Sequence, residues 1–253
     1  MRKFKLWNSN MSNSLDLSSK KYLVSDVTGL GNNFTLNKIQ NKVSGITPEF
    51  GTIQMQINFG INSNAYLNYN EFMNFIESNK EDTLILEYSF DDSIPIRYCD
   101  IYLKSSPKSQ KTSFNILQET FVFERVTLWY NLELKTNQNN VEVINNTTQD
   151  IPVNLTIVEE ANNKTIFIKD ELDNIISETK ITAPQFSLPG TVYIDSVKKK
   201  ATHTKGVTTS IYQYLDKTKN TFIYVPKGKF YLSISSTEGF LTYRWEIKRW
   251  IYD

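Results

Sequence analysis

The residues of this chain that could carry out chemistry are few and lie far apart in the sequence. There is one histidine, His203, and one cysteine, Cys99. Together they could form a nucleophile pair, and the histidine could act as a base or a metal ligand, but a lone histidine does not fill a metal site. His203 stands in the polar, loop-like segment 202–206, which favours an exposed side chain. Cys99 stands in a strand-like apolar segment, which favours a buried and unreactive thiol.

Two pairs of adjacent carboxylates could in principle serve glycoside hydrolysis, which needs two acids roughly 5 to 10 Å apart across a cleft. They are Asp91 with Asp92 and Glu159 with Glu160, and both stand in polar, turn-like segments. Neighbouring residues on a strand face opposite ways, so these pairs are typical of solvated loops. The glycines of segment 28–31 complete neither a dinucleotide fingerprint nor a phosphate loop. The sequence therefore predicts no catalytic residue, no cofactor and no metal site, and hence no enzyme.

Composition limits the classes of protein that remain. The 253 residues suit one large β domain or two domains of roughly 120 to 130 residues each. The net charge of +1 gives no overall field for nucleic acid or an anionic membrane surface. A single cysteine excludes an internal disulfide framework and fits a reducing cytoplasm. We expect no signal peptide and no membrane helix, because no apolar run is long enough for either.

Short runs rich in aromatic and β-branched residues recur along the whole chain between turn formers. Examples are Gly51–Asn58, Thr83–Phe90, Ile96–Leu103, Val153–Val158 and Lys229–Ser235. Closely spaced strands of this kind favour β-sandwiches or barrels over a parallel α/β sheet. The sequence therefore predicts a mainly β fold.

One segment has the period of a helix. An apolar stripe at three- and four-residue spacing is formed by Tyr69, Phe72, Met73 and Ile76. Asn68 with Glu71 is typical of an N-terminal capping box, and Asn79 is typical of a left-handed stop. The spacing predicts a single helix over about 69–78.

The run Leu117–Tyr130 reads as one long strand with apolar residues on both faces. A surface strand needs only one such face, so the pattern predicts burial on both sides or a place in a subunit interface. The polar segment 136–140 follows shortly afterwards. We therefore expect a domain boundary near residues 133–141.

A second aromatic strand lies near the end of the chain. One face of this strand carries Tyr243, Trp245 and Ile247, and the other carries Arg244, Lys248 and Trp250. Tryptophan and arginine are favoured at protein interfaces, so Arg244 and Trp250 are candidate contact residues. A ligand groove is the alternative for this face.

A series of short segments adds a resemblance to a known family. In the first half they are Phe4–Ser9, Asp16–Leu17, Tyr22–Gly31, the helix at 69–78, Leu84–Tyr88 and Tyr98–Leu103. Further on come Phe121–Tyr130, Pro189–Ser196 and Phe222–Gly228. Together and in this order they resemble the distal tail proteins of siphophages that infect Gram-positive bacteria. In that family a strand such as Phe121–Tyr130 ends in a Trp-Tyr pair and closes the first domain.

The resemblance implies a mainly β fold with two β-sandwich domains. The first, over 1–135, would carry the helix and form a ring, and the second, over 136–253, would be galectin-like. The sequence leaves open whether the last strand stays in the second domain or returns to the first. A galectin sugar site needs a His-Asn-Arg and Trp-Glu arrangement that the surroundings of His203 do not supply. Similarity of shape would therefore not imply sugar binding.

For function, the resemblance implies a structural hub in the virion, assembled in the cytoplasm of the host bacterium. Six copies would form a homohexameric ring that joins the tail tube protein to the tail-tip protein and anchors baseplate or receptor-binding proteins. No sequence-specific nucleic acid and no membrane would be bound. A head-to-tail ring hides complementary apolar patches. The surplus aromatic residues that could fill such a ring interface are Trp7, Phe121, Trp129 and Tyr130.

A second function stays open at this point. A lectin-like baseplate protein would bind host cell-wall polysaccharide directly through surface tryptophan or tyrosine side chains.

Overall fold

The protein was analysed as a computed structural model, which describes residues 2–31, 33–39, 42–61, 64–91, 94–106, 116–159, 164–182, 190–236 and 242–251. The chain divides into two compact units, each treated by itself below. The first consists of Met1–Asn131 with Ile251–Asp253, and the second of Leu132–Trp250. The boundary that the sequence suggests, after residue 135, comes shortly after this division.

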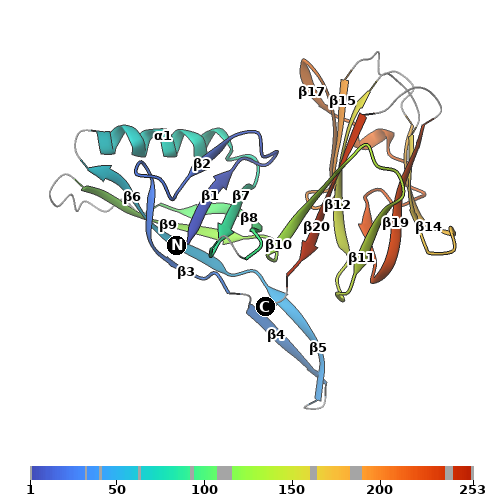
Figure 1. Ribbon diagram of the computed structural model, residues 1–253, viewed down its shortest axis with the longest axis horizontal. Helices are drawn as coiled ribbons and strands as arrows, with labels where there is room; N and C mark the ends of the chain where they lie inside the picture. Colours follow the sequence, from blue (N-terminus) through green and yellow to red (C-terminus); the bar gives the residue numbers. More distant parts are fainter. Residues whose placement is uncertain are drawn as a thin grey trace. The chain divides into compact units, whose positions relative to one another are not determined.

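Seven of the described strands of the first unit form one continuous antiparallel sheet (Figure 1). Its order is β3-β6-β9-β8-β7-β1-β2. These strands span Leu23–Thr28, Thr52–Ile61, Ile116–Arg125, Arg97–Ser105, Leu84–Ser89, Lys3–Trp7 and Ser14–Asp16. A bridge between Ser18 and Leu23 ties the chain after β2 to the start of β3. The bridge therefore brings the two ends of this strand order, β2 and β3, next to each other.

Two further strands of this unit pair only with each other. They are β4, Asn33–Ile39, and β5, Lys42–Glu49. Figure 1 shows them as a two-stranded ribbon that extends away from the body of the first unit.

The core of the first unit is rich in aromatic side chains. Phe59 from β6, Phe72 from the helix α1 and Phe121 from β9 are each fully buried. The ring centroids of Phe72 and Phe121 lie 4.8 Å apart, and those of Phe59 and Phe72 lie 5.4 Å apart. Offset and edge-to-face pairs at such distances add attraction to the burial itself. These rings fix α1 on β6 and β9.

The helix α1 spans Asn64–Ser78, so the sequence-based start at about residue 69 is wrong. Asn68 lies inside the helix, where its side-chain amide donates to the Phe59 carbonyl oxygen over 2.8 Å and caps nothing. Ala65 is buried and extends the apolar stripe by one turn, a position where alanine gives little periodic signal. Glu71 is not part of a capping box either, because its carboxylate pairs with Lys21.

The predicted helix end is confirmed, but its mechanism differs from the one expected. Asn79 does not take a left-handed conformation. Its side-chain amide donates instead to the Phe75 carbonyl oxygen over 2.7 Å, and its backbone N–H donates to the Ile76 carbonyl oxygen over 3.1 Å. Both bonds satisfy carbonyl groups that the last helical turn leaves without partners.

The segment 117–130 is not one strand. β9 ends at Arg125, and β10, Tyr130–Thr136, begins after a break. Asp100 holds the break, because its carbonyl oxygen accepts from the Val126 N–H and its own N–H donates to Thr127 Oγ1. Within β9 only one face is buried, with Phe121 and Phe123 inward and Val122 partly exposed. The expectation of a strand buried on both sides is therefore wrong for β9.

The second unit is a sandwich of two antiparallel sheets. One sheet has the order β17-β16-β15-β12-β20-β10, with β18 paired to one end of β12, and the other has the order β11-β19-β13-β14. In the first sheet the strands are Val207–Ser210, Lys200–Lys205, Gly190–Asp195, Ile151–Glu159, Thr242–Trp250 and, as β18, Tyr224–Val225. In the second they are Val141–Asn145, Gly228–Ser236, Lys164–Lys169 and Ile175–Ile181. A short 3-10 helix, η1, spans Tyr212–Tyr214.

Alternation along these strands builds the core between the two sheets. β11 buries Val141 and Val143, and β12 buries residues such as Leu155 and Ile157. From the last strand, Trp245 and Ile247 face the same core. β20 pairs with β12 over most of its length, so the strand whose placement the sequence left open lies in the second unit up to Trp250. Together with α1, these sheets confirm the predicted mainly β class with one helix, whereas the likeness to galectins stays a prediction.

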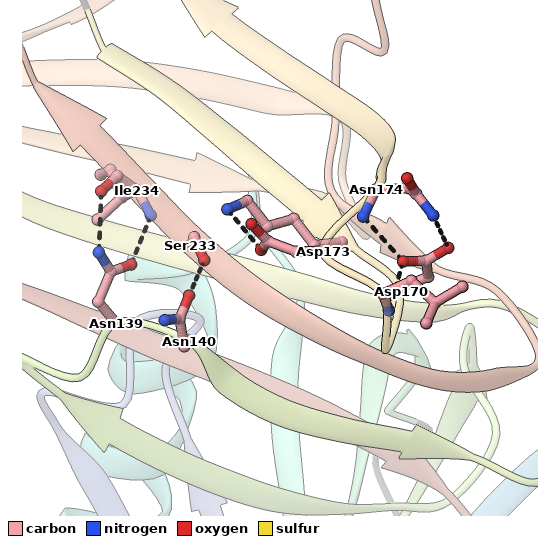
Figure 2. Close-up of polar contacts among 9 residues, drawn as sticks. Asn139, Asn140, Asp170, Asp173, Asn174, Ser233 and Ile234 are labelled. Carbon is pink, nitrogen blue, oxygen red and sulfur yellow. Dashed lines mark hydrogen bonds and ion pairs between the residues drawn. The ribbon is translucent and has the colours of Figure 1, made fainter.

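Asparagines hold the loop before β11 against the two C-terminal strands. The side chain of Asn139 makes two hydrogen bonds to the backbone of Ile234, and Asn140 accepts from Ser233 Oγ (Figure 2). Asn137 in turn accepts from the Tyr243 N–H over 2.9 Å. Asn137 and Asn140 both have a positive φ, which asparagine tolerates better than most residues. The polar segment 136–140 is thus an ordered loop of the second unit.

A second ordered turn joins β13 to β14. Asp170 Oδ1 accepts from the backbone N–H groups of Leu172 and Asn174, each over 2.8 Å (Figure 2). Asp173 has a φ of 65° and pairs with Lys169. An aspartate that bonds its own backbone two residues on is a common turn device.

Candidate functional site

Three of the six candidate interface residues do not reach the surface. Phe121 is fully buried against α1, and Trp129 and Tyr130 are 2% and 1% exposed. Trp129 Nε1 donates to the Leu30 carbonyl oxygen over 2.7 Å. The Tyr130 hydroxyl donates to Asp100 Oδ1 over 2.6 Å. These bonds satisfy the polar atoms of both rings within the first unit, so Phe121, Trp129 and Tyr130 have no face left for a neighbouring subunit.

Trp7 is different, because it is only partly buried at the end of β1. Its Nε1 donates to Glu87 Oε2 over 2.6 Å, and Lys5 Nζ lies 4.8 Å from the centre of its ring. Lys5 and Glu87 are directly opposed on β1 and β7. An indole held by a carboxylate and an ammonium group forms an ordered aromatic surface, which is the kind of anchor that interfaces use.

The sequence interpretation missed the two residues that orient Trp7. Alternation places Lys5 and Trp7 on one face of β1, and this period-2 pattern was visible in the sequence. Glu87 had no such signal, because its pairing with β1 depends on the register of strands that are distant in the sequence.

Arg244 and Trp250 lie on β20 of the second unit. The Arg244 guanidinium is exposed and pairs with Glu246 two residues along the same strand. Trp250 is partly buried against the core, and its Nε1 donates to the Asp150 carbonyl oxygen over 3.0 Å. The structure thus leaves Trp7, Arg244 and Trp250 as candidates with accessible surface, and it does not bring Trp7 together with the other two in one unit.

The single histidine is not exposed, so that expectation is wrong. His203 lies on β16 with 6% of its surface exposed, because alternation along β16 turns it inward with Ala201. A Cβ atom on Gly190 would lie 2.1 Å from His203 Nε2, so only glycine leaves room for the ring. Burial lowers the pKa of His203, and Lys205 and Lys164 lower it further.

The other chemical groups do not form a site in the described residues. Cys99 is buried, as predicted. Asp92 and Glu160 lie outside the described residues, so neither carboxylate pair can be judged by its geometry. In the described part of the chain, no three histidine, cysteine or acidic residues cluster as metal ligands would. Nor does any helix described there have the length and apolar character needed to span a membrane.

Comparisons with known proteins place the first unit in a family. Residues 3–126 match the family model described as the N-terminal domain of the distal tail protein. No curated protein matches the chain.

Solved structures resemble the chain over nearly its whole length. A chain in the structure of the phage P2 baseplate in its activated conformation with Ca has 17% identity and a TM-score of 0.75, with 99% of each chain covered. The strontium form of the same baseplate gives the same values. The Dit protein of phage SPP1, described as a paradigm of the hub adsorption apparatus in phages that infect Gram-positive bacteria, has 11% identity and a TM-score of 0.51, with 97% of this chain and 98% of that chain covered.

These structural similarities show a shared two-unit fold. With the family match over residues 3–126, they support the resemblance found in the sequence, and the chain belongs to the distal tail protein family.

Proposed function

We propose that this protein is the structural hub of a phage tail. Six copies form a ring that joins the tail tube to the tail tip and anchors the receptor-binding components. The observation that carries this proposal is the distal tail domain at residues 3–126, within a fold that matches a phage P2 baseplate chain over 99% of both lengths. The role is structural and not catalytic, and the protein acts in the virion after assembly in the host cytoplasm.

The surface of the first unit supports a role in assembly. Besides Trp7, large apolar side chains such as Phe50, Phe90 and Ile96 are 44 to 52% exposed. Exposed aromatic and aliphatic side chains of this size are typical of surfaces that another protein covers. A closed ring covers such patches on every copy, because each patch meets its complement on the next subunit.

Imaging of the purified protein tests the proposal. Negative-stain electron microscopy and mass photometry at micromolar concentration should show rings of six copies with a central channel. Rings mixed with the tail tube protein of the same phage should cap the ends of the tubes. A monodisperse monomer that forms no rings alone or on tubes would contradict the proposal.

The lectin-like alternative gains nothing from the comparisons. The galectins' sugar-site pattern needs an accessible histidine, whereas the single histidine here is buried on β16.

A further inference from the structure

A buried arginine at the end of β9 is not explained by the packing of the first unit. Arg125 is 1% exposed, and alternation along β9 turns its side chain inward with Phe121 and Phe123. A guanidinium group stays charged in proteins. Burial of a charge is unfavourable unless the charge is paired and hydrogen-bonded. The partners of this group therefore decide what it does.

The Arg125 guanidinium uses only part of its hydrogen-bonding capacity. Nη1 donates to the Gly31 carbonyl oxygen over 3.1 Å. Nε and Nη2 are buried as well, and in the part of the chain that the structure describes they have no hydrogen-bond partner. Burial lowers the pKa of Arg125, and Cys99 is the one described group whose charge counteracts this. Among the described residues, Arg125 is thus a buried cation without a carboxylate partner.

The two nitrogens without partners lie on one edge of the guanidinium plane. In arginine the Nε–H and one N–H of Nη2 point in the same direction, and their spacing matches the two oxygens of a carboxylate. Nη1, which bonds to Gly31, lies on the other side of the group. The unused donors of Arg125 therefore have the arrangement that bidentate recognition of an oxyanion needs.

Arg125 lies at the base of the ribbon formed by β4 and β5 (Figure 1). β4 begins at Asn33, shortly after Gly31, and β5 ends at Glu49, shortly before Gly51. The Arg125 side chain bonds to the Gly31 carbonyl oxygen, and its backbone N–H donates to the Gly51 carbonyl oxygen over 3.0 Å. One residue thus holds the backbone on both sides of the point where the ribbon leaves the body of the first unit.

The backbone around this point is fixed by further contacts. Gly29 has a φ of 81°, and a Cβ atom there would lie 2.0 Å from the Thr52 carbonyl oxygen. Trp129 Nε1 donates to the Leu30 carbonyl oxygen. Gly31, by contrast, is exposed, and a Cβ atom there would meet nothing within 4 Å. The guanidinium therefore lies one residue below the surface, in a frame that is ordered before any ligand arrives.

An exposed apolar residue adjoins the same point. Phe50 directly precedes Gly51 and is 52% exposed. Because the Gly51 carbonyl oxygen accepts from Arg125, a protein that packs on Phe50 approaches the base of the ribbon and the loop above the guanidinium. Large exposed aromatic side chains and desolvated arginines are both typical of the centres of protein interfaces.

We propose that the Nε and Nη2 edge of Arg125 binds an aspartate or glutamate carboxylate of a second copy of this chain. The second copy packs on Phe50, and a shift of the exposed loop at Gly31 admits its carboxylate. Since Cys99 is the one described group that acts electrostatically on Arg125, a single positive charge is available there. This charge balances a carboxylate, and a doubly charged phosphate would need a second cation. The inference rests on the proposed function, because the ring supplies the second copy.

Arg125→Met tests the proposal through two measurements. Mass photometry over a dilution series should show ring formation weakened about tenfold or more, because the carboxylate of the second copy loses its cation. Urea unfolding at a concentration where both proteins are monomeric should show an equal or higher midpoint, because the variant buries no charge. An arginine that served only the fold would lower ring formation and stability together. Lys227→Met, which removes an exposed lysine of the second unit, is the control and should change neither.

Arg125→Lys separates the charge from the geometry. Lysine keeps the positive charge but has no edge with two parallel donors, so ring formation should weaken here too. The carboxylate of the second copy is then found by changing the exposed acidic residues of the first unit to their amides, one at a time. The residue that pairs with Arg125 should weaken ring formation in the wild type and have no further effect in Arg125→Met.

Formate is a direct probe of the site in single subunits. In protein with isotope-labelled arginine, the Nε–H resonance of Arg125 is assigned by its loss in Arg125→Lys. Nuclear magnetic resonance should show a saturable shift of this resonance with sodium formate and none with sodium chloride at the same ionic strength. A shift that sodium phosphate produces at lower concentration than formate would overturn the choice of a carboxylate.

Equal ring formation by the wild type and Arg125→Met would overturn this inference and leave the hub proposal intact. A variant that loses stability and rings together would also overturn it, because Arg125 would then serve the fold alone. If the wild type forms no rings, the hub proposal fails, and the formate titration still decides the carboxylate site. A saturable shift of the Arg125 resonance supports the site, and no shift overturns it.

Discussion

Trp129 Nε1 donates a hydrogen bond of 2.7 Å to the carbonyl oxygen of Leu30, 99 residues earlier in the chain. This bond joins the break between β9 and β10 to the loop after β3. Trp129, which the sequence made a candidate interface residue, therefore links two segments within the first unit.

Replacing Trp129 tests the contribution of this hydrogen bond to stability. Trp129→Phe keeps most of the ring but leaves the Leu30 carbonyl oxygen without its donor, so it should destabilise the protein by about 1 to 2 kcal/mol. Trp129→Ala also opens a cavity and should cost about 3 to 5 kcal/mol. Urea unfolding followed by tryptophan fluorescence and circular dichroism measures both. An unchanged unfolding midpoint for both variants would show that the ring is not part of the core.

The two hydrogen bonds between the Asn139 side chain and the Ile234 backbone should stabilise the second unit. Asn139→Ala removes both hydrogen bonds to Ile234 and should lower the free energy of unfolding by about 1 to 3 kcal/mol. Gln138→Ala is the matched control, because that side chain is exposed and only its backbone carbonyl is used. Equal stability of the two variants in thermal unfolding would argue against a stabilising role for these hydrogen bonds.

Gly190 should be required for the placement of His203. Gly190→Ala puts a methyl group 2.1 Å from the ring nitrogen and should destabilise the second unit by about 1 to 3 kcal/mol. His203→Ala combined with Gly190→Ala should recover part of this loss, since the clash is then absent. Gly31→Ala, which meets nothing within 4 Å, should be nearly neutral. Additive losses in the double variant would exclude the clash as the cause.

The buried Lys164 should make stability depend on pH in the alkaline range. Burial lowers the pKa of Lys164 from 10.5 to about 8 in the folded protein. Between these values the unfolded chain binds more protons, so this group makes the protein more stable as the pH rises from about 8 to 10.5. Its contribution is constant below pH 8, where both states are charged.

Lys164→Met should remove that increase and raise stability at pH 7, because no charge is then buried. Urea unfolding of both proteins at several pH values between 7 and 10.5 gives the difference curve, and Lys227→Met is the exposed control. A flat difference between wild type and Lys164→Met across this range would refute the assignment.

Trp7 should contribute to the proposed ring. Trp7→Ala should shift the distribution from rings toward monomers, because it removes the ordered indole surface on β1. Tyr66→Ala is the matched control, since Tyr66 is an exposed aromatic residue on α1 that was not predicted to lie at the interface. Mass photometry over a dilution series measures the shift, and equal ring populations in wild type and Trp7→Ala would remove Trp7 from the interface.

The sequence alone determined the features that depend on local pattern. Period-2 runs indicated strands such as β11 and β12, and the stripe from Tyr69 to Ile76 indicated the helix and its end at Ser78. The order of many short segments was enough to show the family resemblance. These signals are local, because strand and helix periods act over a few residues.

Tertiary structure decided which faces are covered and which side chains meet. Trp7 and Trp129 both looked like surplus aromatic residues, yet one is partly exposed beside Glu87 and the other is bonded to Leu30. His203 stands in a polar segment but is buried, because Gly190 on the neighbouring strand leaves space for it. The surface hollow lined by Asp150, Tyr212 and Phe222 likewise combines segments that are distant in the sequence. The physical reason is that strand register and sheet packing join residues across long separations, and no local pattern encodes those pairs.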